Sequence, residues 1–76
     1  MENRNLLLTR DSLGDVAYIY LRHPIERGDV VRSELANVQT PDRTRVILGF
    51  DEYDRLLSIE VVGATKLLPP ELFQSR

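Results

Sequence analysis

The chain has 76 residues, with ten Lys and Arg against twelve Asp and Glu, one His and no Cys or Trp, and its net charge is −2 at pH 7. We expect a single domain over residues 1–76, because two domains would each be too short to enclose a core. The lack of cysteine excludes disulfides, thiol catalysis, thiolate metal sites and iron–sulfur clusters. No apolar run approaches the about 18 residues of a membrane-spanning helix. We therefore expect a soluble cytoplasmic protein without a membrane partner.

Residues 6–22 predict a β-hairpin. Residues 6–10 are largely apolar, and residues 16–22 are rich in β-branched and aromatic side chains, which favour strands. Between them lies the sequence Asp11-Ser12-Leu13-Gly14-Asp15. Asp, Ser and Gly favour a turn because their side chains bond the local backbone or leave it unrestricted. Two strands joined by a short polar turn indicate a hairpin.

Three further strands are predicted over residues 30–38, 44–51 and 56–62. The first is polar enough to be an edge strand. A helix stays open there, because Val31, Leu35 and Val38 also have helical spacing. The other two alternate regularly between apolar and polar residues, which is typical of strands with one buried face.

The C-terminal residues predict the end of the sheet and one helical turn. Gly63-Ala64-Thr65 interrupts the last strand, and Pro69-Pro70 precedes a short segment, 71–74, that we expect to form one turn against the sheet. The short connections favour antiparallel neighbours, since a parallel pair needs a long crossover. The predicted fold class is mainly β (small α+β), an antiparallel sheet of about five short strands with a short C-terminal helical turn.

Alternation divides the apolar residues between two faces of this sheet. The predicted core face holds Ala17, Ile19, Leu21, Val46, Leu48, Phe50, Leu57, Ile59 and Val61. The second face holds Val16, Tyr18, Tyr20, Ile47, Leu56 and Val62. Since this second face is too apolar for a solvated surface, we expect either the C-terminal Leu67, Leu68, Leu72 and Phe73 or a second subunit to cover it. A homodimer is the expected assembly.

Two stretches resemble the motifs of the YuzE-like family of small prokaryotic domains. The first is Asp11-Ser12-Leu13-Gly14-Asp15-Val16-Ala17-Tyr18-Ile19-Tyr20-Leu21, and the second is Arg55-Leu56-Leu57-Ser58-Ile59-Glu60-Val61-Val62-Gly63-Ala64-Thr65-Lys66. The resemblance covers residues 6–68, with a longer and more polar middle segment, 23–43, than is usual in the family. It implies a small domain of unknown function, because neither family motif has an assigned chemistry.

Tyr18 and Glu60 are the most suggestive polar pair, and both fall on the second face by alternation. If their strands are neighbours, the phenol can donate a hydrogen bond to the carboxylate. One interpretation is a carboxylate site for a cation or an amine. The interpretation that we favour is structural, with a Tyr–Glu hydrogen bond on a half-buried face and with Asp11 and Asp15 in a structural turn.

Other residues give little indication of catalysis. The acidic turn over residues 51–54 lacks the glycine and the ligand spacing of a calcium loop, so we expect a solvated hairpin turn there. His23 is the only histidine, so a zinc site lacks ligands, and no serine lies in a nucleophile motif. The four glycines do not form a phosphate loop. We therefore expect no catalytic residue, no metal and no cofactor, and predict that the protein is not an enzyme.

Arginine provides nine of the ten basic residues, and it suits protein interfaces. The leading hypothesis is a non-catalytic, protein-binding and oligomerising β module, such as the accessory or antitoxin-like half of a two-gene system with a partner encoded nearby. Its candidate residues are Tyr18, Tyr20, Glu60, Arg22 and Arg45. The alternative is a small-ligand or nucleic-acid binder that uses the Tyr18/Glu60 face or a patch of Arg22, Arg32, Arg43 and Arg45. The net negative charge argues against nucleic acid.

Overall fold

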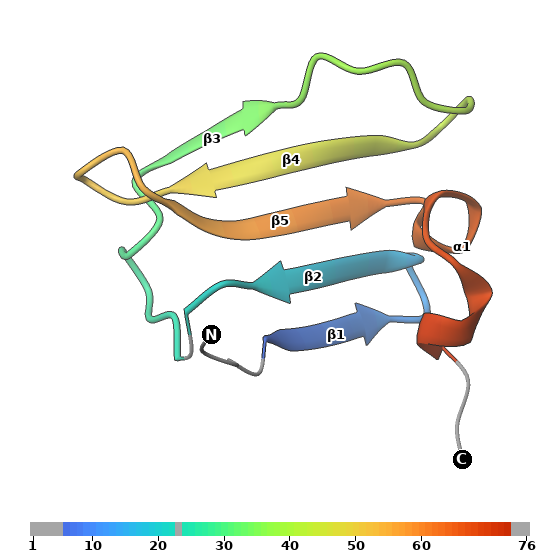
Figure 1. The fold of residues 1–76 in the computed structure, drawn as a ribbon, viewed down its shortest axis with the longest axis horizontal. Coiled ribbons are helices and arrows are strands. Elements are labelled where there is room, and N and C mark those ends of the chain that lie inside the picture. The colour runs from blue at the N-terminus through green and yellow to red at the C-terminus, as the bar shows by residue number, and fades with distance from the viewer. Residues whose placement is uncertain (1–5, 23, 74–76) are drawn as a thin grey trace, which may run out of the picture.

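The computed structural model describes residues 6–22 and 24–73, where one antiparallel sheet has the strand order β1-β2-β5-β4-β3 (Figure 1). The strands are β1 (Leu7–Asp11), β2 (Val16–Tyr20), β3 (Arg32–Leu35), β4 (Arg45–Phe50) and β5 (Leu56–Val62). The predicted fold class is confirmed. The segment for which a helix stayed open contains a strand, β3, at the sheet edge.

The last strand in the sequence, β5, is the middle strand of the sheet. It pairs with β4 through a tight turn and with β2 across a long sequence separation. This second pairing joins the N-terminal hairpin to the rest of the sheet. As a result, the two stretches that resemble the YuzE-like motifs lie side by side on β2 and β5 (Figure 1).

After β5 the chain forms the short helix α1 (Ala64–Leu67) and the 3-10 turn η1 (Pro70–Phe73). The expected helical turn is present as η1, whereas Gln74, its predicted end, lies outside the described residues. Helix α1 was not predicted. It begins after Gly63, whose φ of 79° turns the chain sharply, and the backbone N–H groups of Gly63 and Ala64 donate to the carbonyl oxygen of Asp15.

Helix α1 and turn η1 cover one end of the predicted core face. Ala17, Val61 and Ala64 are buried there, and the half-buried residues packed against them are Leu8, Ile59, Leu67, Leu68 and Phe73. The guanidinium of Arg10, opposite Ala17 in the β1–β2 register, lies 4.8 Å from the centre of the Phe73 ring. The C-terminal segment therefore packs on the core face, and the expectation that it covers the second face is wrong.

The core is small because this cover is short. Among the described residues, the buried hydrophobic side chains are Ala17, Leu57, Val61 and Ala64. The other predicted core residues are half-buried, and Leu21 is 37% exposed. A register shift at Gly49/Phe50 also places Leu56 opposite Phe50, although alternation assigned these two residues to different faces. A β-bulge interrupts the two-residue period in this way.

Candidate binding face

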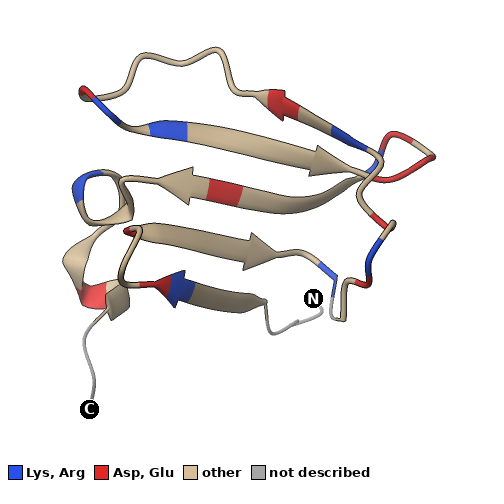
Figure 2. Ribbon diagram, turned by 180° about the vertical axis from the view of Figure 1, so that it is seen from behind, with Lys and Arg blue, Asp and Glu red and all other residues tan. Residues whose placement is uncertain are grey.

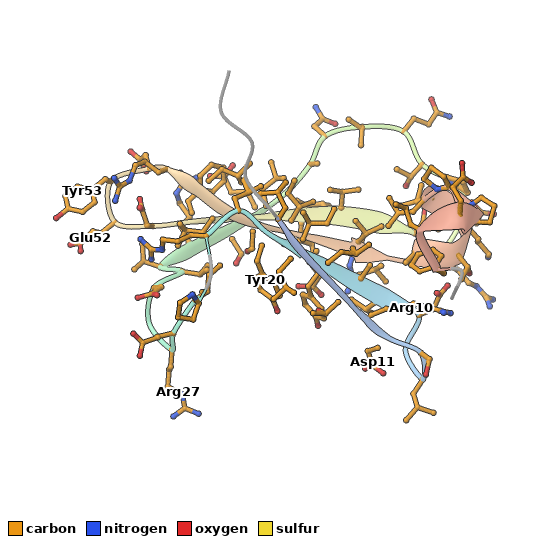
Figure 3. The ribbon with its side chains drawn as sticks, turned by 60° about the horizontal axis from the view of Figure 1, so that its bottom comes forward. Arg10, Asp11, Tyr20, Arg27, Glu52 and Tyr53 are labelled. Carbon is orange, nitrogen blue, oxygen red and sulfur yellow. The ribbon has the colours of Figure 1, made fainter. Side chains whose placement is uncertain are left out.

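We call the sheet surface opposite α1 the tyrosine face. The strand registers align one residue from each of the five strands in a central row: Thr9, Tyr18, Glu60, Ile47 and Leu35. On one side of it runs the row Asp11, Val16, Val62 and Arg45. On the other side runs the row Leu7, Tyr20, Ser58, Gly49 and Ser33. Tyr20 and Asp11 extend from the same side of the sheet in Figure 3.

Tyr18 and Tyr20 form the aromatic part of this face. They are two residues apart on β2, so both point to the same side. Their rings are nearly parallel, with an angle of 9° between the planes and 6.1 Å between the centroids. Both side chains are half-buried. Stacked tyrosines of this kind offer a rigid apolar surface whose hydroxyl groups still reach water or a partner.

Glu60 lies opposite Tyr18 on the central strand, so the strands that carry them are neighbours, as the proposed pair requires. The expected hydrogen bond between them is not among those of the described residues. Instead the negative charge of Glu60, followed by burial, Tyr20 and Asp11, raises the pKa of Tyr18 above its ordinary value of 10.0. Within residues 6–22 and 24–73, the half-buried Glu60 carboxylate forms no ion pair.

The two candidate arginines lie at opposite ends of the tyrosine face. Arg45 is exposed at the start of β4, diagonal to Glu60, and such diagonal positions are about 7–8 Å apart. Arg22 follows the end of β2 and pairs with Asp29 at 3.2 Å. It also borders a cavity of about 180 Å³, lined by Leu7, Tyr20, Arg22, Pro24 and Ile25.

The structure does not bring the four patch arginines together. Arg32 lies on the core-face side, opposite Phe50, with its guanidinium 4.2 Å from that ring and 3.0 Å from Asp54. Arg43 lies in the loop before β4. Basic segments are separated along the ribbon and interspersed with acidic ones (Figure 2). Arg22 and Arg32 are thus paired with separate carboxylates, and the four arginines do not form one basic surface.

Asp11 is the last residue of β1, and Asp15 is the last residue of the turn between β1 and β2. Asp11 accepts a hydrogen bond from the backbone N–H of Leu13 at 3.1 Å. Asp15 accepts bonds from the Thr65 hydroxyl at 2.7 Å and from the Thr65 N–H at 3.2 Å. The Thr65 hydroxyl bond is the main influence that lowers the pKa of Asp15 below 3.8. Asp15 thus joins the hairpin turn to α1, a partner that the sequence interpretation missed.

Asp51 is the buried charged residue among those described, with 5% of its surface exposed. Its Oδ1 accepts the backbone N–H groups of Tyr53 and Arg55 at 2.8 and 2.9 Å, and its Oδ2 accepts the Nε–H of Arg55 at 2.8 Å. The sequence interpretation took residues 51–54 for a solvated turn. Asp51 instead organises the β4–β5 turn by accepting these hydrogen bonds. The sequence feature that could have indicated its burial is its position at the end of an alternating strand.

Residues 6–22 and 24–73 contain no group of three or more His, Cys, Asp and Glu side chains that could hold a metal ion. None of their helices is both long and apolar enough to cross a membrane.

The comparisons with known proteins identify no relative. No family model, no curated protein and no solved structure matches the chain. The resemblance to the YuzE-like family therefore stays a prediction, and functional inference depends on the residues of the chain itself.

Proposed function

We propose that the protein is a non-catalytic binding module that docks another protein surface on its tyrosine face. The observation that carries this proposal is the position of the C-terminal segment, which packs on the core face and leaves Tyr18 and Tyr20 on the opposite side. A sheet face that carries aromatic and aliphatic side chains is normally covered, and a domain usually supplies this cover with a second layer. Here a partner supplies it.

The composition of the tyrosine face supports a protein partner. Half-buried Val16, Ile47 and Val62 surround the tyrosines, while Glu60 and Arg45 provide charges of both signs. Protein interfaces combine aromatic and apolar centres with polar groups that fix orientation. A cytoplasmic partner encoded nearby, as in an antitoxin-like two-gene system, is one form of this proposal. A second copy of the chain is another.

Site-specific photo-crosslinking tests the proposal. A benzophenone side chain is placed at Tyr18 in one variant and at Tyr53, which is 69% exposed on the β4–β5 turn, in the control. We expect irradiation of cells that express these variants to join the position-18 probe to a protein, with several-fold less product from position 53. The proposal would be contradicted if the position-18 probe formed no protein adduct, or formed no more of it than the position-53 probe.

A further inference from the structure

We propose that the occupant of the tyrosine face is a second copy of this chain, held by two reciprocal ion pairs in which Arg45 of each copy meets Glu60 of the other. This inference rests on the proposed protein-binding function and makes it specific. It follows from the charges on the face, the strand registers and the area of the sheet.

The charges on the tyrosine face suit a second copy. Each protomer presents the half-buried carboxylate of Glu60 on the central strand and the exposed guanidinium of Arg45 on the next strand. The ion pairs of the described residues do not join them. In a two-fold dimer, a contact from Arg45 to Glu60 occurs twice by symmetry. Glu60 and Arg45 of one copy therefore both find a partner of opposite charge when the surface faces itself.

The registers specify where the two-fold axis lies. An axis directly over Glu60 would bring two carboxylates together, which is unfavourable. The favourable axis lies between the two facing sheets, runs perpendicular to the strands, and passes midway between the central row and the row of Val62 and Arg45. Rotation about this axis places each strand of one copy over the same strand of the other copy, and the two run in opposite directions. Arg45 of one copy then lies over Ile47 of the other, beside Glu60. Arg and Glu side chains together span the about 10 Å between packed sheets.

The area of the face suits a weak dimer. Five strands of four to seven residues form the sheet. With strands about 4.8 Å apart and about 3.3 Å per residue, two copies in full overlap would cover about 900 Å². Interfaces below about 1,200 Å² belong to weak or transient complexes. With the two-fold axis placed as above, Tyr18 and Val16 form the apolar centre, and Tyr20 lies at the rim.

Two charge-reversal variants test the pairing, Glu60→Arg and Arg45→Glu. We expect the unaltered chain to be dimeric at about 100 µM by light scattering, and each variant alone to dimerise at least about 10-fold more weakly, because like charges then face each other. An equimolar mixture of the two variants should recover the dimer as a heterodimer, since both cross-protomer pairs are again of opposite sign. Pairing within one protomer cannot produce that recovery.

Overall charge does not explain the expected heterodimer. From −2, Glu60→Arg gives a net charge of 0 and Arg45→Glu gives −4, so the variants are not oppositely charged molecules. Matched controls are Glu52→Arg in the β4–β5 turn and Lys66→Glu in α1, on the other side of the sheet, which make the same charge changes at exposed sites. These controls should dimerise like the unaltered chain. Circular dichroism melts establish that each variant is folded.

Each remaining outcome overturns a defined part of the proposal. A monomeric unaltered chain at about 100 µM would overturn the self-association, whereas an adduct of the Tyr18 probe with another protein would leave the binding function standing. A dimer that tolerates both charge reversals would overturn the Arg45–Glu60 pairing. Should Glu60→Arg fail to fold, the exposed Arg45→Glu decides alone: it should dimerise at least about 10-fold more weakly, and a dimer as tight as that of the unaltered chain would overturn the pairing.

Discussion

Gly63→Ala is expected to lower the melting temperature by about 15 °C, which corresponds to about 3 kcal/mol in a domain of this size. Gly63 has a φ of 79°, and a left-handed backbone costs other residues about 1–2 kcal/mol. A Cβ at this position would also lie 2.6 Å from Cγ2 of Thr44 and 3.3 Å from the carbonyl oxygen of Arg43. The backbone must then shift at the start of α1, the only α-helix of the described residues, which covers one end of the core face.

Gly28→Ala is the matched control for this prediction. Gly28 also has a positive φ, 91°, but no heavy atom lies within 4 Å of the Cβ that alanine would add. The control therefore measures the effect of the backbone conformation alone, and we expect its melting temperature to decrease by about 5–10 °C. Thermal melts of the two variants followed by circular dichroism compare them. Equal decreases would show that the contact with Thr44 does not restrict the chain.

Asp51→Ala is expected to lower the melting temperature by about 10 °C, because it leaves three N–H donors of the β4–β5 turn without their acceptor. Asp51→Asn retains one carbonyl oxygen as acceptor and should cause a smaller decrease. The control is Asp54→Asn in the same turn, whose carboxylate is 82% exposed and pairs with Arg32. Exposed ion pairs contribute little, so this control should melt within about 3 °C of the unaltered chain.

The effect of Asp51→Asn should also depend on pH. Burial, the largest influence, raises the pKa of Asp51, but the hydrogen bonds from Arg55 and Tyr53 and the charge of Arg55 together lower it below 3.8. A carboxyl group with a lowered pKa stabilises the fold above its unfolded pKa, and this stabilisation is lost as the pH falls through the folded pKa. The difference in melting temperature between Asp51→Asn and the unaltered chain should therefore be complete at about pH 7 and should decrease once the pH is below the ordinary pKa of 3.8. A constant difference would contradict this assignment.

Local pattern was sufficient to predict most of the sheet. Residues 56–62 alternate cleanly and form β5 with the predicted bounds. A turn separates β1 from β2 within the predicted segment 11–15, with Asp11 as the last residue of β1. Alternation also placed Tyr18 and Glu60 on one face, and the β2–β5 register aligns them. Periodicity follows from the geometry of one strand, so it needs no knowledge of the neighbours.

The features that the sequence did not reveal depend on contacts between distant segments. Helix α1 begins where the carbonyl of Asp15 meets the N–H groups of Gly63 and Ala64, and Thr65 is 50 residues from its partner Asp15. The hydrophobic periodicity of a single segment does not predict such a long-range contact. The same contact directs the C-terminal segment to the core face, which hydrophobicity alone left undecided. The burial of Asp51 was missed because acidic turns are mostly solvated.

Hydroxyl-radical footprinting of the three tyrosines tests the central claim, that protein covers the tyrosine face, most directly. Oxidation of Tyr18 and Tyr20 is measured relative to that of Tyr53 by mass spectrometry, in dilute purified protein and in intact cells. The account predicts that the ratio falls several-fold in cells, because a partner excludes water from the stacked rings while the turn residue stays exposed. An unchanged ratio would show that the tyrosine face remains open to water and would contradict the account.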